Sequence, residues 1–554
     1  LAATRVDVNG LIEKGRENIL LRSNAFDNSY WNKSASTITT GQADPNGGTN
    51  AFKIVENTSN AYHRIYGAYT MVSGNVYATS VTAKAAGRDY LTLSNNVASG
   101  TAVFDLTDGS VATQESNVIS ASATSLGGGW YRCEMVAKGD KSGSYNVFIG
   151  ADDDGTIGTY TGDGTSGVFI YQSQLELGLV ATDYIETGSS TAQAGILEDM
   201  PRLDYSGGAS CPALLLEPQR TNELSHSEYI NSAGGYTITG ASATYNSNTS
   251  PDGHTNATLF DIPYNNAGFY NFATGGSKSV GDKITISLFA KLKSGSVTNV
   301  LKLGYGGVAV GGDRLSEFNL STGTISYSHP SADSVSIEDY GNGWYRLIQT
   351  QTCSAAGAAG AVMYGKGEMD VYIWGVQSEN ASYPTSYIPT YGTSVTRSNE
   401  SQNTTYDDIF TNGEGLVFME FDIEDVTISG YPQIFQIFNP SSSSDRFWCY
   451  IFNDTDSGEI NFGYRLDDNG ARQSEGSFTI DTTTTAKIAL RLEKNNYAAY
   501  YNGTKDVPTP HNGVVNGMTK ISFSSIPYPV GVSLKQFVTF PTPLTDSEME
   551  ALTE

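Results

Sequence analysis

Positively charged residues are scarce in this 554-residue chain, which has 32 lysines and arginines against 58 aspartates and glutamates and a formal net charge of −26. Affinity for nucleic acid comes mainly from lysine and arginine contacts with phosphates. The charge therefore excludes nucleic acid as a partner and disfavours anionic membranes and acidic polymers. It suits a soluble surface that faces outward. No run of about 20 apolar residues is present, so we expect no membrane insertion.

Residues that mark common enzyme and metal sites are also sparse. The five histidines are dispersed, and no HxxxH or CxxC pair suggests zinc. No GxSxG elbow, phosphate loop or dinucleotide fingerprint stands where a strand would meet a helix. The four cysteines, Cys133, Cys211, Cys353 and Cys449, occupy non-equivalent places. We expect buried free thiols rather than a disulfide framework.

Glycine and tyrosine, in contrast, are abundant, with 60 and 34 copies, and serine, threonine and asparagine are frequent. Glycine supplies turns, while threonine, tyrosine and valine suit strands. Short alternating segments such as TISLFAK are separated by Gly, Asn and Asp turns, and no long helical period is visible. This pattern predicts an all-β protein.

The tetrapeptide GWYR occurs twice, at 129–132 and 343–346. Five further blocks recur in the same order: RENILLRS/RTNELSHS, YATSVTAKAA/ITISLFAKLK, VFDLTDGSV/EFNLSTGTI, VFIYQSQLE/VYIWGVQSE and ATDYIET/PTSYIPT. Six ordered matches indicate a domain duplication. We expect the two copies to share one fold, with Trp130 and Trp344 buried at equivalent positions and Arg132 and Arg346 on the other face.

The domain organisation follows from these blocks. The predicted units are a lead segment (1–14), a first jelly-roll module (15–190), a connector (191–218), a second jelly-roll module (219–397) and a third β-sandwich (398–554). In the connector, LLLEPQ indicates an extended segment packed against a neighbour. In the third domain, Asn502-Gly503 predicts a hairpin turn, and Thr545 with Glu548 predicts a capping box on a short terminal helix.

Particular phrases carry a family resemblance. The C-terminal stretch, with YYNGT, VSLKQFVTF and LTDSEMEAL, resembles the concanavalin A-like, laminin-G-type sandwich. The modules, with NILLRSNAFDNSYW, DPNGGTNAFK, GWYR and TDYIET, resemble carbohydrate-binding-like jelly rolls of tailed-phage structural proteins and some bacterial surface proteins. The segment PRLDYSGGASCPALLLEPQRTN is similar to a connector of phage fibre or head-decoration proteins.

The resemblance implies a non-enzymatic virion protein, a fibre, spike or head decoration on the virion surface, outside the cell. Its implied partners are cell-surface glycans, other virion proteins and further copies of itself, most simply in a homotrimer. Two alternatives stay open. One is a secreted or surface-bound bacterial polysaccharide-binding protein, and the other is a glycan depolymerase.

Aromatic rings that can stack on sugar faces are the candidate carbohydrate-binding residues. Tyr30, Trp31, Tyr66 and Tyr270, together with Tyr264, lie in segments that could present such platforms. The alternative is that these rings lie in contacts between domains or subunits, where tyrosine and tryptophan are also favoured.

An acidic loop, ADDDGTIGTYTGDGTSG, is the candidate metal site. Asp152, Asp154 and Asp163, with Asp153, provide hard oxygen ligands for Ca²⁺. Asp-Gly pairs are also ordinary turn residues, and the second module replaces this region with AAGAAGAVMYGKGEMD. Calcium is therefore not a requirement of the module, and we expect no other cofactor.

The depolymerase alternative rests on MEFDIED, where Glu420, Asp422 and Glu424 alternate along one strand face. Two such carboxyls at a suitable spacing are what a glycosidase needs. The competing interpretation is the charged, solvated side of the domain's opening strand. We assign no catalytic residue.

Overall fold

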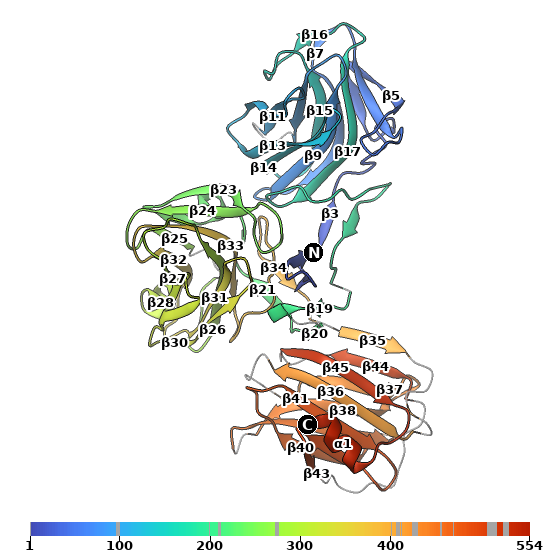
Figure 1. The fold of residues 1–554 in the computed structure, drawn as a ribbon, viewed down its shortest axis with the longest axis vertical. Coiled ribbons are helices and arrows are strands. Elements are labelled where there is room, and N and C mark those ends of the chain that lie inside the picture. Colours follow the sequence, from blue (N-terminus) through green and yellow to red (C-terminus); the bar gives the residue numbers. More distant parts are fainter. Residues whose placement is uncertain are drawn as a thin grey trace.

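The computed structural model describes residues 2–95, 100–198, 200–208, 212–271, 276–399, 401–405, 410, 413–423, 430–454, 457–468, 470–506, 518–524 and 531–554. Three β-sandwiches follow one another along the long axis of the molecule (Figure 1). The helices of the described part are α1 (Asp546–Thr553) and the 3₁₀ turns η1 (Ser206–Gly208), η2 (Ser232–Gly234) and η3 (Val308–Val310). None of them is long and apolar enough to cross a membrane. The all-β prediction is confirmed.

The first sandwich consists of two antiparallel six-stranded sheets. Its front sheet has the order β12 (Val111–Gln114), β11 (Thr101–Asp105), β10 (Tyr90–Ser94), β15 (Gly143–Asp152), β8 (His63–Met71), β4 (Asn32–Ser34). Its back sheet has the order β13 (Val118–Gly127), β14 (Trp130–Lys138), β9 (Val76–Ala85), β17 (Gly167–Leu177), β6 (Ala51–Glu56), β5 (Ser36–Gln42). Two short pairs complete it: β7 (Asn60–Ala61) with β16 (Tyr160–Thr161), and β3 (Arg16–Asn18) with β18 (Ala192–Ala194).

The second sandwich repeats this arrangement. Its front sheet has the order β29 (Thr324–Tyr327), β28 (Arg314–Asn319), β27 (Val300–Gly306), β32 (Gly360–Gly365), β25 (Gly268–Asn271), β22 (Thr237–Thr239). Its back sheet has the order β30 (Ala332–Asp339), β31 (Trp344–Thr352), β26 (Lys283–Leu292), β33 (Met369–Glu379), β24 (Ala257–Ile262), β23 (Ser242–Asn248). The pair β21 (Arg220–Asn222) and β34 (Val395–Arg397) corresponds to β3 and β18. Strand for strand, the order matches the first sandwich, as the duplication predicts.

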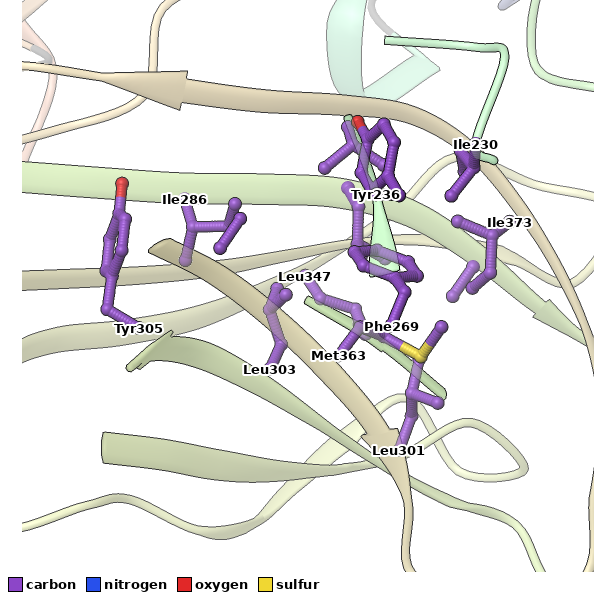
Figure 2. Close-up of a cluster of buried hydrophobic side chains, with 14 of the residues drawn as sticks. Ile230, Tyr236, Phe269, Ile286, Leu301, Leu303, Tyr305, Leu347, Met363 and Ile373 are labelled. Carbon is purple, nitrogen blue, oxygen red and sulfur yellow. The ribbon is translucent and has the colours of Figure 1, made fainter. Parts of the chain in front are cut away.

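The core of each sandwich lies between its two sheets. Figure 2 shows this layer in the second sandwich, where Phe269 of the front sheet lies with Ile286 and Ile373 of the back sheet. These side chains alternate along each strand with outward-facing ones, so one face of every strand is apolar. The inward face builds the core, and the outward face is left for other contacts.

The GWYR tryptophans open equivalent strands, β14 and β31, and both are buried, with 5% and 3% of their surface exposed. The expectation that Arg132 and Arg346 lie on the other face is wrong. Strand side chains alternate, so residues two apart share a face. Tyr131 and Leu347 pack against the cores instead, while the tryptophans and arginines face outward.

In the first sandwich, the arginine of GWYR helps to hold the segment that follows β17 against the back sheet. Arg132 donates to the carbonyl of Thr182, and the amide of Gln174 donates to the carbonyls of Thr182 and Asp183 at 3.2 Å. The Gln174 oxygen accepts from the backbone N–H of Ile185 at 2.6 Å. The buried segment after β17 therefore has its backbone polar groups satisfied by side chains.

The second sandwich makes the same bonds. Arg346 donates to the carbonyl of Thr385 at 2.7 Å, and Gln377 donates to the carbonyls of Thr385 and Ser386 at 3.3 and 3.4 Å. The Gln377 oxygen accepts from the N–H of Ile388 at 2.6 Å. We call these two sets of bonds the closing networks, and they explain why GWYR, VFIYQSQLE and ATDYIET recur together.

The third sandwich pairs two sheets of seven and six strands. The larger has the order β19 (Leu203–Asp204), β20 (Ala213–Leu216), β45 (Val532–Phe540), β36 (Gly415–Ile423), β41 (Ala486–Leu492), β42 (Ala498–Tyr501), β43 (Thr504–Asp506). The smaller has the order β35 (Ser401–Thr405), β44 (Lys520–Ser524), β37 (Gln433–Asn439), β38 (Ser442–Asn453), β39 (Ile460–Asp468), β40 (Ala471–Thr479). The LLLEPQ segment thus forms a strand, β20, that pairs with β45 of the third sandwich.

Local predictions for this domain are confirmed. Asn502 and Gly503 form the turn between β42 and β43, with φ angles of 43° and 75°. Both values lie in the left-handed region that a tight hairpin turn requires. Thr545 caps α1, and the reciprocal bond from its backbone N–H to Glu548 completes the capping box.

The lead segment packs on the second sandwich, although it precedes the first in sequence. It forms a hairpin of β1 (Thr4–Val6) and β2 (Ile12–Lys14), whose Val6 and Ile12 cluster with Trp344. Lys14 forms ion pairs with Glu228 at 2.8 Å and Asp252 at 2.6 Å. Burial lowers and these carboxylates raise the pKa of Lys14, and the net direction is upward.

Three of the four cysteines behave as predicted. Cys133, Cys353 and Cys449 are buried free thiols. Burial raises the pKa of each of them, so the reactive thiolate form is disfavoured. Cys211 lies outside the described residues.

Candidate carbohydrate-binding faces

The outward face of the first sandwich's front sheet carries aromatic rings. Tyr66 of β8 and Phe148 of β15 stand opposite each other, with ring centroids 5.3 Å apart. Tyr62, just before β8, is 42% exposed. These rings alternate along β8 with core residues such as Ile65, so the strand pattern itself turns them outward. We call this set, with Arg64, the first aromatic face.

Arg64 lies within these rings. Its guanidinium carbon is 3.9 Å from the centroid of Phe148 and 4.7 Å from that of Tyr62. Burial lowers the pKa of Arg64 from its ordinary value, yet an arginine stays charged at neutral pH. The face therefore combines flat apolar surface with one positive charge, a combination suited to sugar rings and polar substituents.

The second sandwich carries the corresponding tyrosine. Tyr270 of β25 holds the place in its front sheet that Tyr66 holds in β8, since both strands lie second from the same edge. Its cross-strand neighbour is the aliphatic Val362, and Tyr364 lies two residues further along β32. Two of the predicted sugar-binding residues thus occupy equivalent outward positions.

The other two predicted residues do not form a platform. Trp31 is fully buried in the first core, where its indole Nε1 donates to the Arg22 carbonyl at 3.0 Å. Its assignment to sugar binding is wrong, because no ring face is left for a ligand. Tyr30 packs edge-on against Trp31 and donates to the Ala68 carbonyl at 2.7 Å. Burial raises its pKa to about 12.

The third sandwich holds an aromatic strip that sequence reasoning missed. Along β38, Trp448, Tyr450 and Phe452 face outward, alternating with core residues. Centroids of Trp448 and Tyr450 lie 4.5 Å apart, and those of Tyr450 and Phe452 lie 5.8 Å apart. Tyr431, 60% exposed, covers Tyr450 and Phe452 at 5.6 and 5.7 Å. The alternation in FWCYIF, with aromatic residues on the face away from the core, was the signal available in the sequence.

Two arginines flank this strip, and they share one carboxylate. Arg446 and Arg465 lie 5.0 and 5.6 Å from the Trp448 ring. Asp467 accepts from both, at 3.3 and 2.6 Å, and also from the indole Nε1 of Trp448 at 3.1 Å. The strip therefore offers ring surface beside arginines that already have an acidic partner.

The structure brings together only part of the predicted calcium site. Ligand oxygens of Asp152, Asp153 and Asp154 lie within 4.8 Å of one another. Asp163 does not belong to this group of oxygens, so its inclusion in the site is wrong. Thr165 and Ser166 of its own loop donate to both of its carboxylate oxygens, and these bonds lower its pKa. Calcium itself stays a prediction.

The carboxylate row is described as far as Asp422. Asp422 accepts from the Thr485 hydroxyl at 2.7 Å and forms an ion pair with Lys535 at 2.8 Å. Glu420 stands opposite Lys487 and Gln536 in the neighbouring strands. Glu424 lies outside the described residues. The described part of the row resembles a solvated sheet face with cations across it, as the competing interpretation proposed.

No family model matches the chain, and no curated protein does. Among solved structures, it is similar to the CBM40 module of Ruminococcus gnavus IT-sialidase bound to α2,3-sialyllactose, at 16% identity over 26% of this chain and 83% of that one, with a TM-score of 0.22. It is also similar to the tandem CBM22-1–CBM22-2 domain of Paenibacillus barcinonensis Xyn10C, at 13% identity over 66% and 98% of the two chains, with a TM-score of 0.21. Sheep galectin-11 matches at 11% identity over 26% and 96%, with a TM-score of 0.17. At these scores the function must be inferred from the chain's own residues.

Proposed function

We propose that this protein is a non-enzymatic adhesion protein that binds glycans through the outward faces of its sandwiches. The observation that carries the proposal is the presence of aromatic side chains on the outward face of one sheet in every sandwich. In the two modules Tyr66 and Tyr270 stand at equivalent positions, and in the third domain the β38 strip is topped by Tyr431. Rings exposed beside polar groups are suited to stack on pyranose faces.

Three such faces on one chain suit weak individual sites. A single sugar contact is weak, but a second contact made by the same molecule gains effective concentration. A homo-oligomer, for which a trimer is our proposal, multiplies the faces again. The formal charge of −26 favours the solubility of a protein whose binding faces are turned to solvent.

The role on a particle is the second part of the proposal. We propose that the protein is a fibre, spike or head decoration on the virion surface of a tailed phage, in contact with other virion proteins. Support comes from the family resemblance of the two modules and the connector, which together span most of the chain. The adhesion role does not depend on this assignment.

Glycan binding is tested on the full chain with a glycan array, followed by titration calorimetry of the best ligand. Tyr66→Ala, Tyr270→Ala and Tyr431→Ala remove one outward-facing ring from each sandwich, and each should weaken binding several-fold. Val280→Ala is the control, because Val280 is 69% exposed and has no ring. Failure of every glycan to bind, or equal loss in the control, would contradict the proposal.

The absence of hydrolysis and the particle role have separate tests. Incubation with bound glycans should release no reducing ends. Release that Glu420→Gln abolishes would show that the carboxylate row is catalytic. Light scattering should give a mass of three chains, and mass spectrometry of purified particles should detect the protein. A monomer that is absent from virions would contradict the particle assignment and leave the glycan test intact.

A further inference from the structure

In the part of the chain that the structure describes, Arg64 has no acidic partner. Several other arginines in this acidic chain form ion pairs, such as Arg88 with Glu56 at 2.6 Å and Arg202 with Glu217 at 2.6 Å. Among the residues that the structure describes, none accepts a hydrogen bond from the Arg64 guanidinium, and its Nε is buried without a partner. Arg64 therefore keeps a positive charge that no described carboxylate offsets, and such a guanidinium can take an external anion.

The ring contacts of Arg64 leave its hydrogen-bonding edge available. A guanidinium stacks on aromatic rings through its flat faces, whereas its N–H groups point out in the plane. Phe148 and Tyr62 are the rings that the Arg64 guanidinium contacts. That planar fork matches the two oxygens of a carboxylate. The rings therefore hold the arginine in place for an anion instead of neutralising it.

The residues that stand opposite Arg64 in the neighbouring strands are small. Across the sheet, Arg64 stands opposite Gly150 of β15 and Ser34 of β4. Gly150 has no side chain to cover the guanidinium, and a Cβ there would lie 2.8 Å from the Cβ of Arg64. Tyr66 lies two residues along the same strand face, within ring contact of Phe148.

We propose that the first aromatic face binds an acidic sugar, with the pyranose against Tyr66 and Phe148 and the sugar carboxylate on the Arg64 guanidinium. The proposal rests on the glycan-binding function above and specifies the ligand class at one of its faces. Uronic and sialic acids share this chemistry, a six-membered sugar ring with a carboxylate. The chain's negative charge disfavours acidic polymers in general, so we expect an acidic sugar to bind where an arginine without an acidic partner lies beside aromatic rings, as Arg64 does.

The second sandwich is a natural control. In its front sheet, the position two residues before Tyr270 is Gly268, whereas the position two residues before Tyr66 is Arg64. The cation on this face is Lys302, whose ammonium donates to the side-chain oxygens of Asn265 and Asn266 at 2.9 and 2.8 Å. Its cross-strand neighbour is Glu317. The second face should therefore bind neutral sugars and show no preference for a carboxylate.

The test is calorimetric titration of the full chain with matched probes. Sialyllactose is compared with lactose, and a glucuronic-acid disaccharide with its glucose counterpart, so the two sources of the carboxylate are separated. At least one acidic probe should bind about tenfold more tightly than its neutral partner, and added salt should reduce only that difference.

Variants assign the difference to Arg64. Arg64→Gln should abolish the acidic preference, so that acidic and neutral probes bind with equal affinity, and the unfolding midpoint should show that the variant is folded. Arg64→Lys should retain only part of the preference, because an ammonium lacks the planar fork. Lys302→Gln, the matched change on the second face, should leave the preference intact. Equal affinity for acidic and neutral probes would overturn this inference and leave the proposed function standing, whereas binding of no glycan at all would overturn both.

Discussion

The first and second sandwiches close with the same hydrogen bonds, made by Gln174 in one and by Gln377 in the other. Outside the cores they differ. The first aromatic face has Arg64 and Phe148 where the second has Gly268 and Val362. The recurring sequence blocks therefore contain the residues of the closing networks. Positions that differ between the modules determine what each outward face can bind.

A second difference concerns what covers the back sheets. In the second sandwich, Trp344 lies beneath the lead hairpin, whereas Trp130 of the first lies in a small cluster with Ala51 and Tyr171. The second sandwich also holds a buried ion cluster in which Glu217 of the connector pairs with Arg202 and Arg397. In the first, the place of Arg397 in the short strand pair is taken by Ala194, so the cluster belongs to one module alone.

The largest expected effect comes from breaking that cluster. Glu217→Ala leaves Arg202 and Arg397 buried without their shared carboxylate, which should lower the free energy of unfolding of the second sandwich by about 3–5 kcal/mol. Denaturant titration read by hydrogen exchange should show loss of protection there and none in the first sandwich. Glu13→Ala, which removes a partly exposed pair with Arg5, is the control and should cost less than about 1 kcal/mol. Equal loss in both sandwiches would contradict the asymmetry.

The same cluster predicts an acid response. Burial would raise the pKa of the Glu217 carboxyl, but Arg397 and Arg202 outweigh it and hold that pKa well below its usual range. A depressed pKa stabilises the fold above the unfolded value of about 4.3 and loses that contribution as the pH falls. The stability gap between wild type and Glu217→Ala should therefore be full at neutral pH and narrow below about pH 4. A gap that does not change with pH would show that the charge is not its source.

Next in size are the closing networks, which should be equal in the two modules. Gln174→Ala and Gln377→Ala each remove the side-chain acceptor of a buried N–H, that of Ile185 or Ile388, together with the bonds from the amide to the carbonyls of the closing segment. Each should cost about 2–3 kcal/mol in its own sandwich. Gln114→Ala, on an exposed edge strand, should be nearly neutral. Chemical denaturation of the three variants measures this. A clearly smaller loss in one module would mean that the repeated blocks do not have the same role.

Several features of the fold could be predicted from the sequence because they are local or repeated. Alternation and turn residues predict strands, and ordered blocks predict two like sandwiches. The neighbour of LLLEPQ could not be predicted, since β20 pairs with β45 more than 300 residues away. The lead and connector contact the second and third sandwiches of their own chain, and these partners could not be predicted either.

The candidate sites show the same limit. Tyr66 and Tyr270 face outward because alternation places them opposite core residues, and that alternation could be read in HRIYGAYTM. Trp31 follows no such pattern, and its burial depends on the packing of Phe26 and Tyr30 around it. The role of Arg64 could not be predicted, because it depends on contact with Phe148, which lies on the neighbouring strand of the sheet. Pairing between distant strands was the missing information.

Replacing a residue of the first face by its counterpart on the second should change a free energy by less than the variants above. Phe148→Val gives the first face the residue that the second has at Val362, which removes a stacking ring and the support of Arg64. Affinity for the preferred acidic probe should fall about tenfold, roughly 1.4 kcal/mol, while the closing network is untouched. Calorimetry measures the change, and Val362→Ala on the second face is the control. Unchanged affinity would show that Phe148 takes no part in binding.

The smallest expected effect concerns the acidic loop, which is a further difference between the two modules. In the first, fourteen residues link β15 to β17 and include Asp153 and Asp154, whereas three residues link β32 to β33 in the second. Burial raises the pKa of Asp152, and a bound cation would offset the cost of keeping its carboxylate charged.

With a dissociation constant of about 1 mM, as in extracellular calcium modules, 5 mM Ca²⁺ should stabilise the first sandwich by about 1 kcal/mol, which is a rise of roughly 2–4 °C in its unfolding midpoint. Asp153→Asn should remove the rise, and Asp163→Asn should keep it, because the carboxylate of Asp163 is already satisfied by Thr165 and Ser166. A calcium response that depends on Asp163 and not on Asp153 would restore the site as first predicted from the sequence.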